Sequence, residues 1–190
     1  MSAAARFPGA FRALAVLAVL VLAACGGGGG GGGGTPTQPT PPPPPPPGIT
    51  FTAAGVAGAN SLALANGSGT TATNMVLELR ANQVTDLYGV AFDLAYPSAQ
   101  LQFARVTAGP LLSGGAVQAS VTSPGTLVVG GTHLGNVPGA NGSGVVLTLE
   151  LTAVAAGSGS FTFSRNSALS SSGQTIAGVT WVAGSVQVNR

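Results

Sequence analysis

The side chains that could do acid–base chemistry in this chain are few and widely spaced. Beyond residue 24 there are one histidine and four carboxylates, namely His133, Glu78, Asp86, Asp93 and Glu150. Glu78 and Glu150 both fall at outward positions of expected β-strands, and glycoside hydrolysis would need two carboxylates about 5–10 Å apart. Two solvated surface charges are the simpler interpretation. We therefore assign no catalytic residue and expect a protein that is not an enzyme.

The sequence contains no cluster of residues that would support metal binding or nucleophilic catalysis. His133 follows a Gly-Gly-Thr segment, and its nearest acidic neighbour in the sequence is Glu150. A solvated loop histidine and a metal ligand are both compatible with that position, and no metal site is assigned. The single cysteine, Cys25, excludes an internal disulfide and a cysteine-based metal cage. The sequence contains no G-x-S-x-G motif, no phosphate-binding Walker loop and no Cys/His cluster.

Three aromatic side chains are candidates for a carbohydrate platform, on which a ring stacks against a sugar face. Tyr96 shares the inward parity of its strand and is expected in the core. Trp181 shares its parity with Val179 and Ala183, which places it in the core or at its rim, and Tyr88 is expected to be half exposed. Sugar-binding faces usually combine several exposed rings, so carbohydrate binding stays an alternative.

A strict alternation between residues 86 and 103 marks the strand around which these candidates are placed. One side of it carries Val90, Phe92, Leu94 and Tyr96, and the other carries Gly89, Ala91, Asp93 and Ala95. Because successive Cβ atoms of a strand leave opposite faces, this period of two predicts a half-buried strand. Pro97 ends it, since proline cannot donate to a strand ladder.

Similar short runs recur throughout residues 49–190, between clusters of Gly, Asn, Ser and Pro. Residues 75–81 place Met75, Leu77, Leu79 and Ala81 inward, and residues 145–154 place Val145, Leu147, Leu149, Leu151 and Ala153 inward. No window carries the apolar stripe of an amphipathic helix. The pattern predicts one all-β domain over residues 49–190, a β-sandwich of about nine strands in two sheets.

Residues 1–24 have the features of a lipoprotein signal peptide. Arg6 and Arg12 form a positive n-region, and residues 13–22 are an unbroken apolar run that is too short to span a hydrocarbon core of about 30 Å. Residues 22–25, LAAC, resemble the lipobox of bacterial lipoproteins, in which the cysteine is acylated and the signal is cleaved before it. The resemblance implies lipidation at Cys25. Gly26 supplies no inner-membrane retention aspartate, which favours the outer membrane, with the domain exposed outside the cytoplasm.

Residues 25–48 are expected to be the acylated cysteine followed by a disordered linker. Nine glycines at 26–34 and seven prolines at 41–47 cannot bury apolar surface, so the first part should be flexible and the second stiffer. Without Arg6 and Arg12 the chain has four arginines against four carboxylates, and its net charge is zero instead of +2. A neutral domain with no basic patch is not expected to bind nucleic acid.

The order of motifs over residues 50–188 resembles that of a cohesin domain. The first half contributes MVLELR (75–80), DLYGVAFDLAYP (86–97) and LQFARVTAG (101–109). The second half contributes GTLVVG (125–130), GVVLTLELTA (144–153) and GSFTF (159–163). The resemblance implies a nine-stranded jelly-roll β-sandwich, related in fold to carbohydrate-binding modules. It also implies binding of dockerin modules, whose helices carry calcium sites.

The expected partner-binding face departs from the cohesin pattern. In the best-known cohesins an Asn and an Asp, two residues apart on the exposed side of the central strand, hydrogen-bond the dockerin, and the matching residues here are Gly89 and Ala91. Asp93 is the only charge on that side. The expected partner-binding residues are Tyr88, Gly89, Ala91 and Asp93, and the departure favours a different partner or a more apolar contact.

These features predict a membrane-anchored, surface-displayed protein-binding module. The resemblance links it to the assembly of extracellular complexes, often ones that degrade polysaccharide, with a dockerin-bearing protein as the partner. No cofactor is assigned to this chain, and any calcium is expected on the dockerin. The alternative function is a carbohydrate-binding module that attaches the cell to polysaccharide, and a structural envelope protein without a specific ligand is the third interpretation.

Overall fold

The computed structural model describes residues 45–190, so the predicted signal peptide, Cys25 and most of the predicted linker lie outside the described residues. The described residues form eleven strands and one short 3₁₀ helix. In chain order they are β1 (Gly48–Ala53), β2 (Ser61–Asn66), β3 (Asn74–Leu87), β4 (Gly89–Ala95), β5 (Leu101–Ala108), η1 (Pro110–Leu112), β6 (Ala116–Ser123), β7 (Thr126–Thr132), β8 (Ala140–Ala153), β9 (Gly157–Leu169), β10 (Thr180–Val182) and β11 (Gly184–Asn189). The all-β prediction is confirmed, with two strands more than expected. No helix of this part of the chain is long and apolar enough to cross a membrane.

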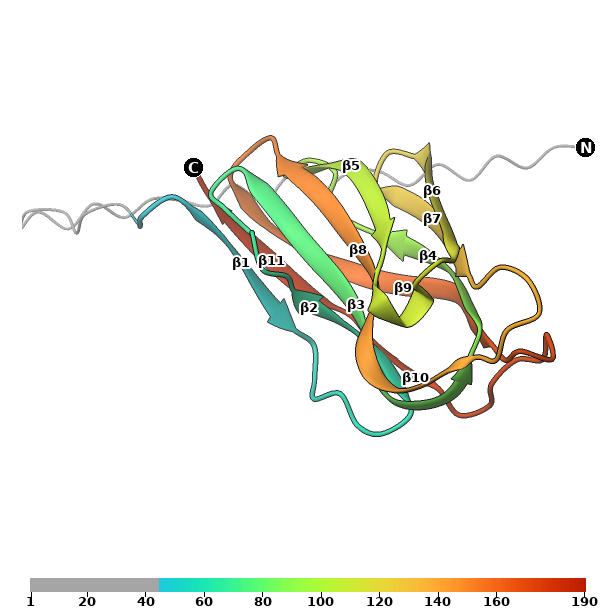
Figure 1. Cartoon of the computed structure of the whole chain (residues 1–190). Coiled ribbons are helices and arrows are strands. Elements are labelled where there is room, and N and C mark those ends of the chain that lie inside the picture. The colour runs from blue at the N-terminus through green and yellow to red at the C-terminus, as the bar shows by residue number, and fades with distance from the viewer. Residues whose placement is uncertain (1–44) are drawn as a thin grey trace, which may run out of the picture. The chain divides into compact units, whose positions relative to one another are not determined.

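The strands form two sheets that pack face to face. One sheet has six strands in the order β1-β11-β9-β4-β7-β6, and the other has five in the order β10-β2-β3-β8-β5. Figure 1 shows the two layers, with β3 and β8 in one and β9 and β11 in the other. Neighbouring strands of residues 45–190 are antiparallel except for the parallel pair of β2 and β10.

The core lies between the two sheets and is filled by the inward half of each alternating strand. From β3 these residues are Met75, Leu77, Leu79 and Ala81, and from β4 they are Val90, Phe92 and Leu94, all of them buried as the alternation predicts. Phe92 also packs edge-on against the ring of Phe163 from β9, with the ring centroids 5.3 Å apart. Burial of these apolar side chains is the main favourable contribution to folding.

The stretch between residues 86 and 103 is divided differently from the expectation. Strand β3 does not end at Ala81 but continues to Leu87, because Gln83 and Asp86 adopt left-handed backbone conformations (φ 49° and 55°) that bulge the strand. Asp86 and Leu87 therefore belong to the five-stranded sheet. Tyr88 lies between the two strands, at the corner where the chain crosses to β4 in the other sheet.

A further bulge, in strand β8, changes which valine enters the core. The register against β3 shifts between the Leu79–Leu147 pair and the Arg80–Val145 pair, which leaves Val146 unpaired. Val146 is consequently buried in the core, whereas Val145, which was expected to point inward, is only half-buried. An extra residue on one strand of a pair breaks the alternation in this way.

Gly48 and Leu169 lie at opposite ends of the six-stranded sheet. Gly48, the last residue of the predicted linker, pairs with Asn189, so the first and last strands of the described residues have these two ends side by side. Strand β9 begins at that end, with Gly157 opposite Val188, and it finishes at Leu169 opposite Gly89. Its 13 residues place the Leu169 end roughly 35–40 Å from the end where Gly48 lies.

Candidate functional site

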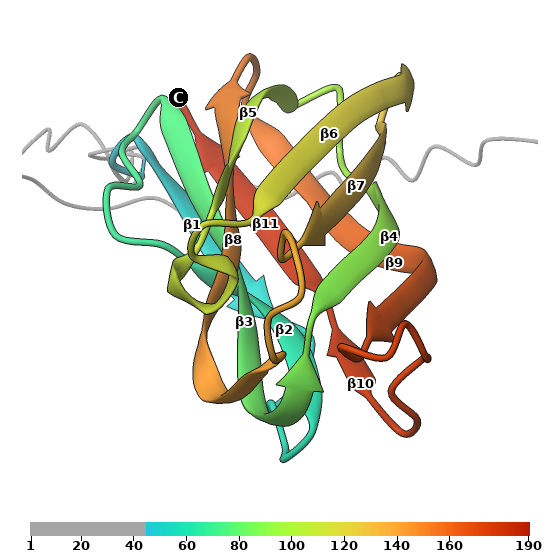
Figure 2. The same cartoon turned by 45° about the vertical axis from the view of Figure 1, so that its right-hand side comes forward.

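The solvent-facing side of β9, β4, β7 and β6, here called the β4 face, carries most of the residues that the sequence singled out. Figure 2 shows these four strands side by side. Gly89 lies between Thr132 of β7 and Leu169 of β9, and Ala91 lies opposite Gly130 of β7. The residues beside Ala91, namely Gly130 and Ser167, are therefore small, whereas Leu169 lies beside Gly89.

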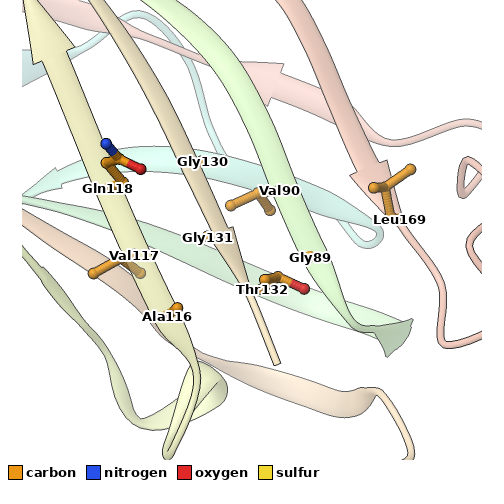
Figure 3. A pocket seen from close by; sticks show the side chains of 9 residues that line it. All are labelled: Gly89, Val90, Ala116, Val117, Gln118, Gly130, Gly131, Thr132 and Leu169. Carbon is orange, nitrogen blue, oxygen red and sulfur yellow. The ribbon is translucent and has the colours of Figure 1, made fainter. Parts of the chain in front are cut away.

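A hollow of about 470 Å³ opens at the Leu169 end of this face (Figure 3). It is lined by Gly89 and Val90 of β4, Ala116, Val117 and Gln118 of β6, Gly130, Gly131 and Thr132 of β7, and Leu169 of β9. Its volume falls within the roughly 300–1,000 Å³ of ordinary ligand pockets. No charged side chain is among its lining residues.

Glycines on two neighbouring strands create the hollow. A Cβ on Gly130 would meet no atom within 4 Å, so the missing side chain leaves open space on the face. Gly89 is buried, and a Cβ there would lie 3.1 Å from the carbonyl oxygen of Gly131. Because glycine covers so little, the backbone of β4 and β7 forms the floor of the hollow, and the side chains of Val90 and Val117 point to the core side of the sheet. The site suits an apolar or neutral group, for which Gln118 and Thr132 supply the polar contacts.

Asp93 is not the free surface charge that the alternation predicts. Its Oδ2 accepts hydrogen bonds from Nε of Arg165, at 2.7 Å, and from Nη2 of the same guanidinium. The Asp93 side chain is 10 % exposed and that of Arg165 is 76 % exposed, so the arginine covers the carboxylate. The parity of Asp93 is correct, but the charge that this face presents to solvent is positive.

Tyr88 and His133 form the corner beside the hollow. The two rings are tilted, with their centroids 5.6 Å apart, and the backbone N–H of His133 donates to the carbonyl of Tyr88 at 2.9 Å. The Tyr88 hydroxyl donates to the carbonyl of Gly135. Tyr88 is half-buried, as expected, and it fixes the loop that follows β7. Within residues 45–190 no three metal-ligating side chains gather around His133 or elsewhere.

Glu78 and Glu150 lie on the outer side of the five-stranded sheet, away from the hollow. They occupy diagonal positions on β3 and β8, because Val76 opposes Glu150 and Glu78 opposes Thr148. Each is held by an arginine at 2.6 Å, Glu78 by Arg80 and Glu150 by Arg105. The hydrogen bond to Glu150, followed by its charge, raises the pKa of Arg105. Two carboxylates bound in this way are surface ion pairs and not an acid–base pair for hydrolysis.

The aromatic residues proposed for a sugar platform lie in or against the core. Tyr96 is 8 % exposed, which confirms its inward assignment. Trp181 is half-buried and packs against Phe92 and Phe163, with ring centroids 5.5 and 5.1 Å away. Among the described residues, the β4 face therefore gains no flat aromatic surface from these two rings.

Sequence reasoning placed Gly89 and Ala91 on the face correctly but missed the residues that shape it. Gly130 provides the opening, Gln118 a polar rim, and Arg165 the exposed charge. A signal for the first was present, because two consecutive glycines inside a strand pattern often mark a close approach or a missing contact. No comparable signal marked Gln118 or Arg165.

Comparison with known proteins gives one family and a consistent set of structures. The model of the cohesin domain matches residues 61–188. A non-cellulosomal cohesin from Archaeoglobus fulgidus is 16 % identical, with a TM-score of 0.51 over 73 % of this chain and 88 % of that one. The type II cohesin A11 from Bacteroides cellulosolvens is 15 % identical, with a TM-score of 0.58 over 68 % of this chain and 99 % of that one. No curated protein sequence matches the chain.

A third similar structure was determined as a type II cohesin–X-dockerin complex from Acetivibrio cellulolyticus. It is 16 % identical, with a TM-score of 0.55 over 64 % of this chain and 93 % of that one. Identities this low establish a common fold. The family model, in contrast, spans β2 to β11 and thus both sheets, including all four strands of the β4 face. The chain therefore belongs to the cohesin domain family.

Proposed function

We propose that this protein is a non-catalytic module that binds a dockerin-bearing protein through the β4 face. The observation that carries the proposal is the glycine-floored hollow at the Leu169 end of that face. Of the structures similar to this chain, the Acetivibrio cellulolyticus complex pairs its cohesin with an X-dockerin. A dockerin is therefore the first partner to test here.

The chemistry of the hollow explains how binding proceeds without the polar anchors expected from the family. Gly89 and Ala91 offer no side-chain hydrogen bond, but they allow a partner to approach the backbone of β4 closely. An apolar side chain placed in the hollow, against Ala116 and Leu169, loses contact with water, and burial of apolar area stabilises a complex. The contact should consequently depend on shape more than on hydrogen bonds.

The ion pairs of the opposite sheet support a binding role over a catalytic one. Glu78 and Glu150 are each engaged by an arginine and lie on a different sheet from the hollow. A hydrolase would need a proton donor and a second carboxylate facing one cleft. The work of such a module is to hold its partner in an extracellular assembly, for which we propose a polysaccharide-degrading enzyme as cargo.

We further propose that a lipid at Cys25 tethers the module to the outer membrane. Acyl chains contribute about 0.8 kcal/mol per buried methylene, and two or more chains anchor a protein stably. The linker joins the domain at Gly48, at the opposite end of the six-stranded sheet from the hollow. A tether at that end leaves the hollow free to face away from the membrane.

The anchor is tested by labelling with a fatty-acid probe and by cell fractionation. Wild-type protein should incorporate the probe and remain with membranes, and Cys25→Ala should lose the probe and become soluble. Equal labelling of the two proteins would reject lipidation at Cys25.

The binding function is tested with dockerin modules encoded in the same genome, purified with calcium and measured by calorimetry. Gly130→Val fills the hollow, and it should cause little strain because a Cβ at this position meets no atom and valine favours strands. Thr148→Val is the matched control, since it adds the same side chain to the outer side of the other sheet. We expect the wild type and the control to bind alike, and Gly130→Val to bind roughly tenfold more weakly or worse.

Two results would count against this function. If the wild type binds none of the dockerins, with or without calcium, the dockerin assignment is wrong. If a dockerin binds Gly130→Val as tightly as the wild type, the binding surface lies outside the hollow. Thermal unfolding of both variants shows whether a loss of binding reflects a loss of structure.

A further inference from the structure

Arg165 is the one exposed charge of a face that is otherwise neutral. The four strands of the β4 face contain only two charged residues, Asp93 and Arg165. Asp93 is largely covered, whereas the Arg165 side chain is 76 % exposed. A partner that covers this face must therefore meet a guanidinium.

The position of Arg165 depends on a strained bulge. Ala91 pairs with Ser167 and Asp93 with Ser164, so two residues of β9, Arg165 and Asn166, lie opposite the single residue Phe92. Arg165 adopts a left-handed backbone conformation with φ 47°, which is unfavourable for a residue with a Cβ. Bulges re-aim side chains and are frequent beside functional sites, and local strain of this kind clusters at such sites.

Asp93 holds the guanidinium by one edge and leaves the other free. Nε and Nη2 both donate to Oδ2 of Asp93, whereas Nη1 donates to no acceptor within residues 45–190. An arginine carries five N–H donors in a fixed plane. The carboxylate of Asp93 thus orients the plane, and the remaining donors point away from it.

We propose that the partner carries a carboxylate that pairs with the free edge of Arg165, beside the apolar group that enters the hollow. This inference rests on the proposed function and specifies its partner. A neutral or basic group over Arg165 would bury N–H donors without acceptors, which is costly, whereas a carboxylate can accept two of them at once. Gly130 lines the hollow and pairs with Ala91, two residues along β4 from Asp93, so Asp93 lies roughly 7 Å along the strand from the nearest part of the hollow.

The test uses the full-length binding domain and the same panel of calcium-loaded dockerin modules. Arg165→Glu reverses the charge and Arg165→Gln removes it. Arg105→Glu is the control, because Arg105 is also paired with a carboxylate, that of Glu150, and its side chain is 66 % exposed, but on the opposite sheet. Affinities are measured by calorimetry at low and physiological salt, and thermal unfolding checks each variant.

A dockerin that binds the wild type should lose roughly tenfold or more in affinity to Arg165→Glu and less to Arg165→Gln, and it should be unaffected by Arg105→Glu. Changing the responsible carboxylate of the dockerin to arginine should restore its binding to Arg165→Glu. Arg165→Gln keeps the test valid if Arg165→Glu fails to fold.

Loss of the carboxylate contact and loss of dockerin binding would give different results. A dockerin that binds the wild type and both Arg165 variants equally overturns the carboxylate and leaves the proposed function standing. Equal losses for Arg165→Glu and Arg105→Glu also overturn it, because the effect then comes from net charge. The absence of any dockerin binding to the wild type overturns the proposed function and this inference with it.

Discussion

The carboxylate of Asp86 accepts hydrogen bonds from the hydroxyl and the backbone N–H of Ser171, at 3.0 and 3.3 Å, although the two residues are 85 positions apart. Its other oxygen accepts the N–H of Gly139 at 3.0 Å. The Ser171 hydroxyl is the main cause of a pKa for Asp86 below its ordinary value of 3.8; burial opposes it, and the two N–H groups add to it. Three segments around the hollow end of the domain therefore meet at one ionised side chain.

Replacing Asp86 with asparagine should reduce the pH dependence of stability. Because the folded pKa is lowered, the carboxylate stabilises the fold fully above its unfolded pKa, near 3.8, and this contribution disappears as the pH falls through the lower folded value. Asparagine tolerates the left-handed backbone at this position, so the variant isolates the charge. Urea unfolding from pH 7 to pH 3 should show a wild-type advantage that is constant above about pH 5 and shrinks below pH 4. An advantage that persists unchanged at pH 3 would contradict this account.

Replacing Arg165 with glycine should cost less stability than replacing it with alanine. Both variants lose the ion pair with Asp93, so their difference reports the backbone alone. At φ 47° a Cβ is unfavourable and glycine is not, which predicts that Arg165→Gly is more stable than Arg165→Ala by about 1 kcal/mol. Urea unfolding measures this difference directly. If alanine proves equal or better, the bulge is not strained and Arg165 is not held in place at a cost.

The elements that the sequence predicted well are those whose alternation is unbroken. Residues 75–81 and 90–96 keep a period of two, and their inward side chains are buried as expected. The predicted strand boundaries and core positions were wrong where a bulge inserts an extra residue. Gln83 and Asp86 extend β3 beyond its regular pattern, and Val146 replaces Val145 in the core. A bulge leaves no periodic signal, because it depends on how the neighbouring strand is paired.

Only part of the candidate site was predicted, because a bulge also determines the rest of it. The outward parity of Asp93 is a local property and was correct, but its cover comes from Arg165, which is 72 residues away and turned by a bulge. The hollow exists because Gly89 of β4 and Gly130 of β7 lie on adjacent strands, two residues apart in register and on the same side of the sheet. That register follows from the packing of both sheets and cannot be predicted from the sequence of either strand alone.

Adding a methyl group to Gly184 should loosen the edge strand β1. A Cβ on Gly184 would lie 2.4 Å from the ring of Phe51 and 2.5 Å from the carbonyl oxygen of Thr52, and the second contact is with backbone that cannot rotate away. Overpacking of this kind typically costs about 1–3 kcal/mol. Gly130→Ala is the matched control in another strand, where a Cβ meets nothing within 4 Å, and it should be neutral or slightly stabilising. Chemical unfolding of the two variants checks the difference, and equal stabilities would show that β1 can shift freely.

Truncating Trp181 should destabilise the core, and the fluorescence of Trp181 in the wild type should not respond to carbohydrate. The indole packs against Phe92 and Phe163, and loss of its ring contacts predicts a cost of about 3 kcal/mol for Trp181→Ala and roughly half of that for Trp181→Phe. Because Trp181 is the only tryptophan of the chain, its fluorescence reports this environment without interference. Emission should shift to the red on unfolding and should not change when soluble glucans or xylans are added to the folded wild type. A saturable change with a glycan would place a sugar against this ring and revive the carbohydrate-binding alternative, whereas a small cost for Trp181→Ala would show that the aromatic cluster contributes little to the core.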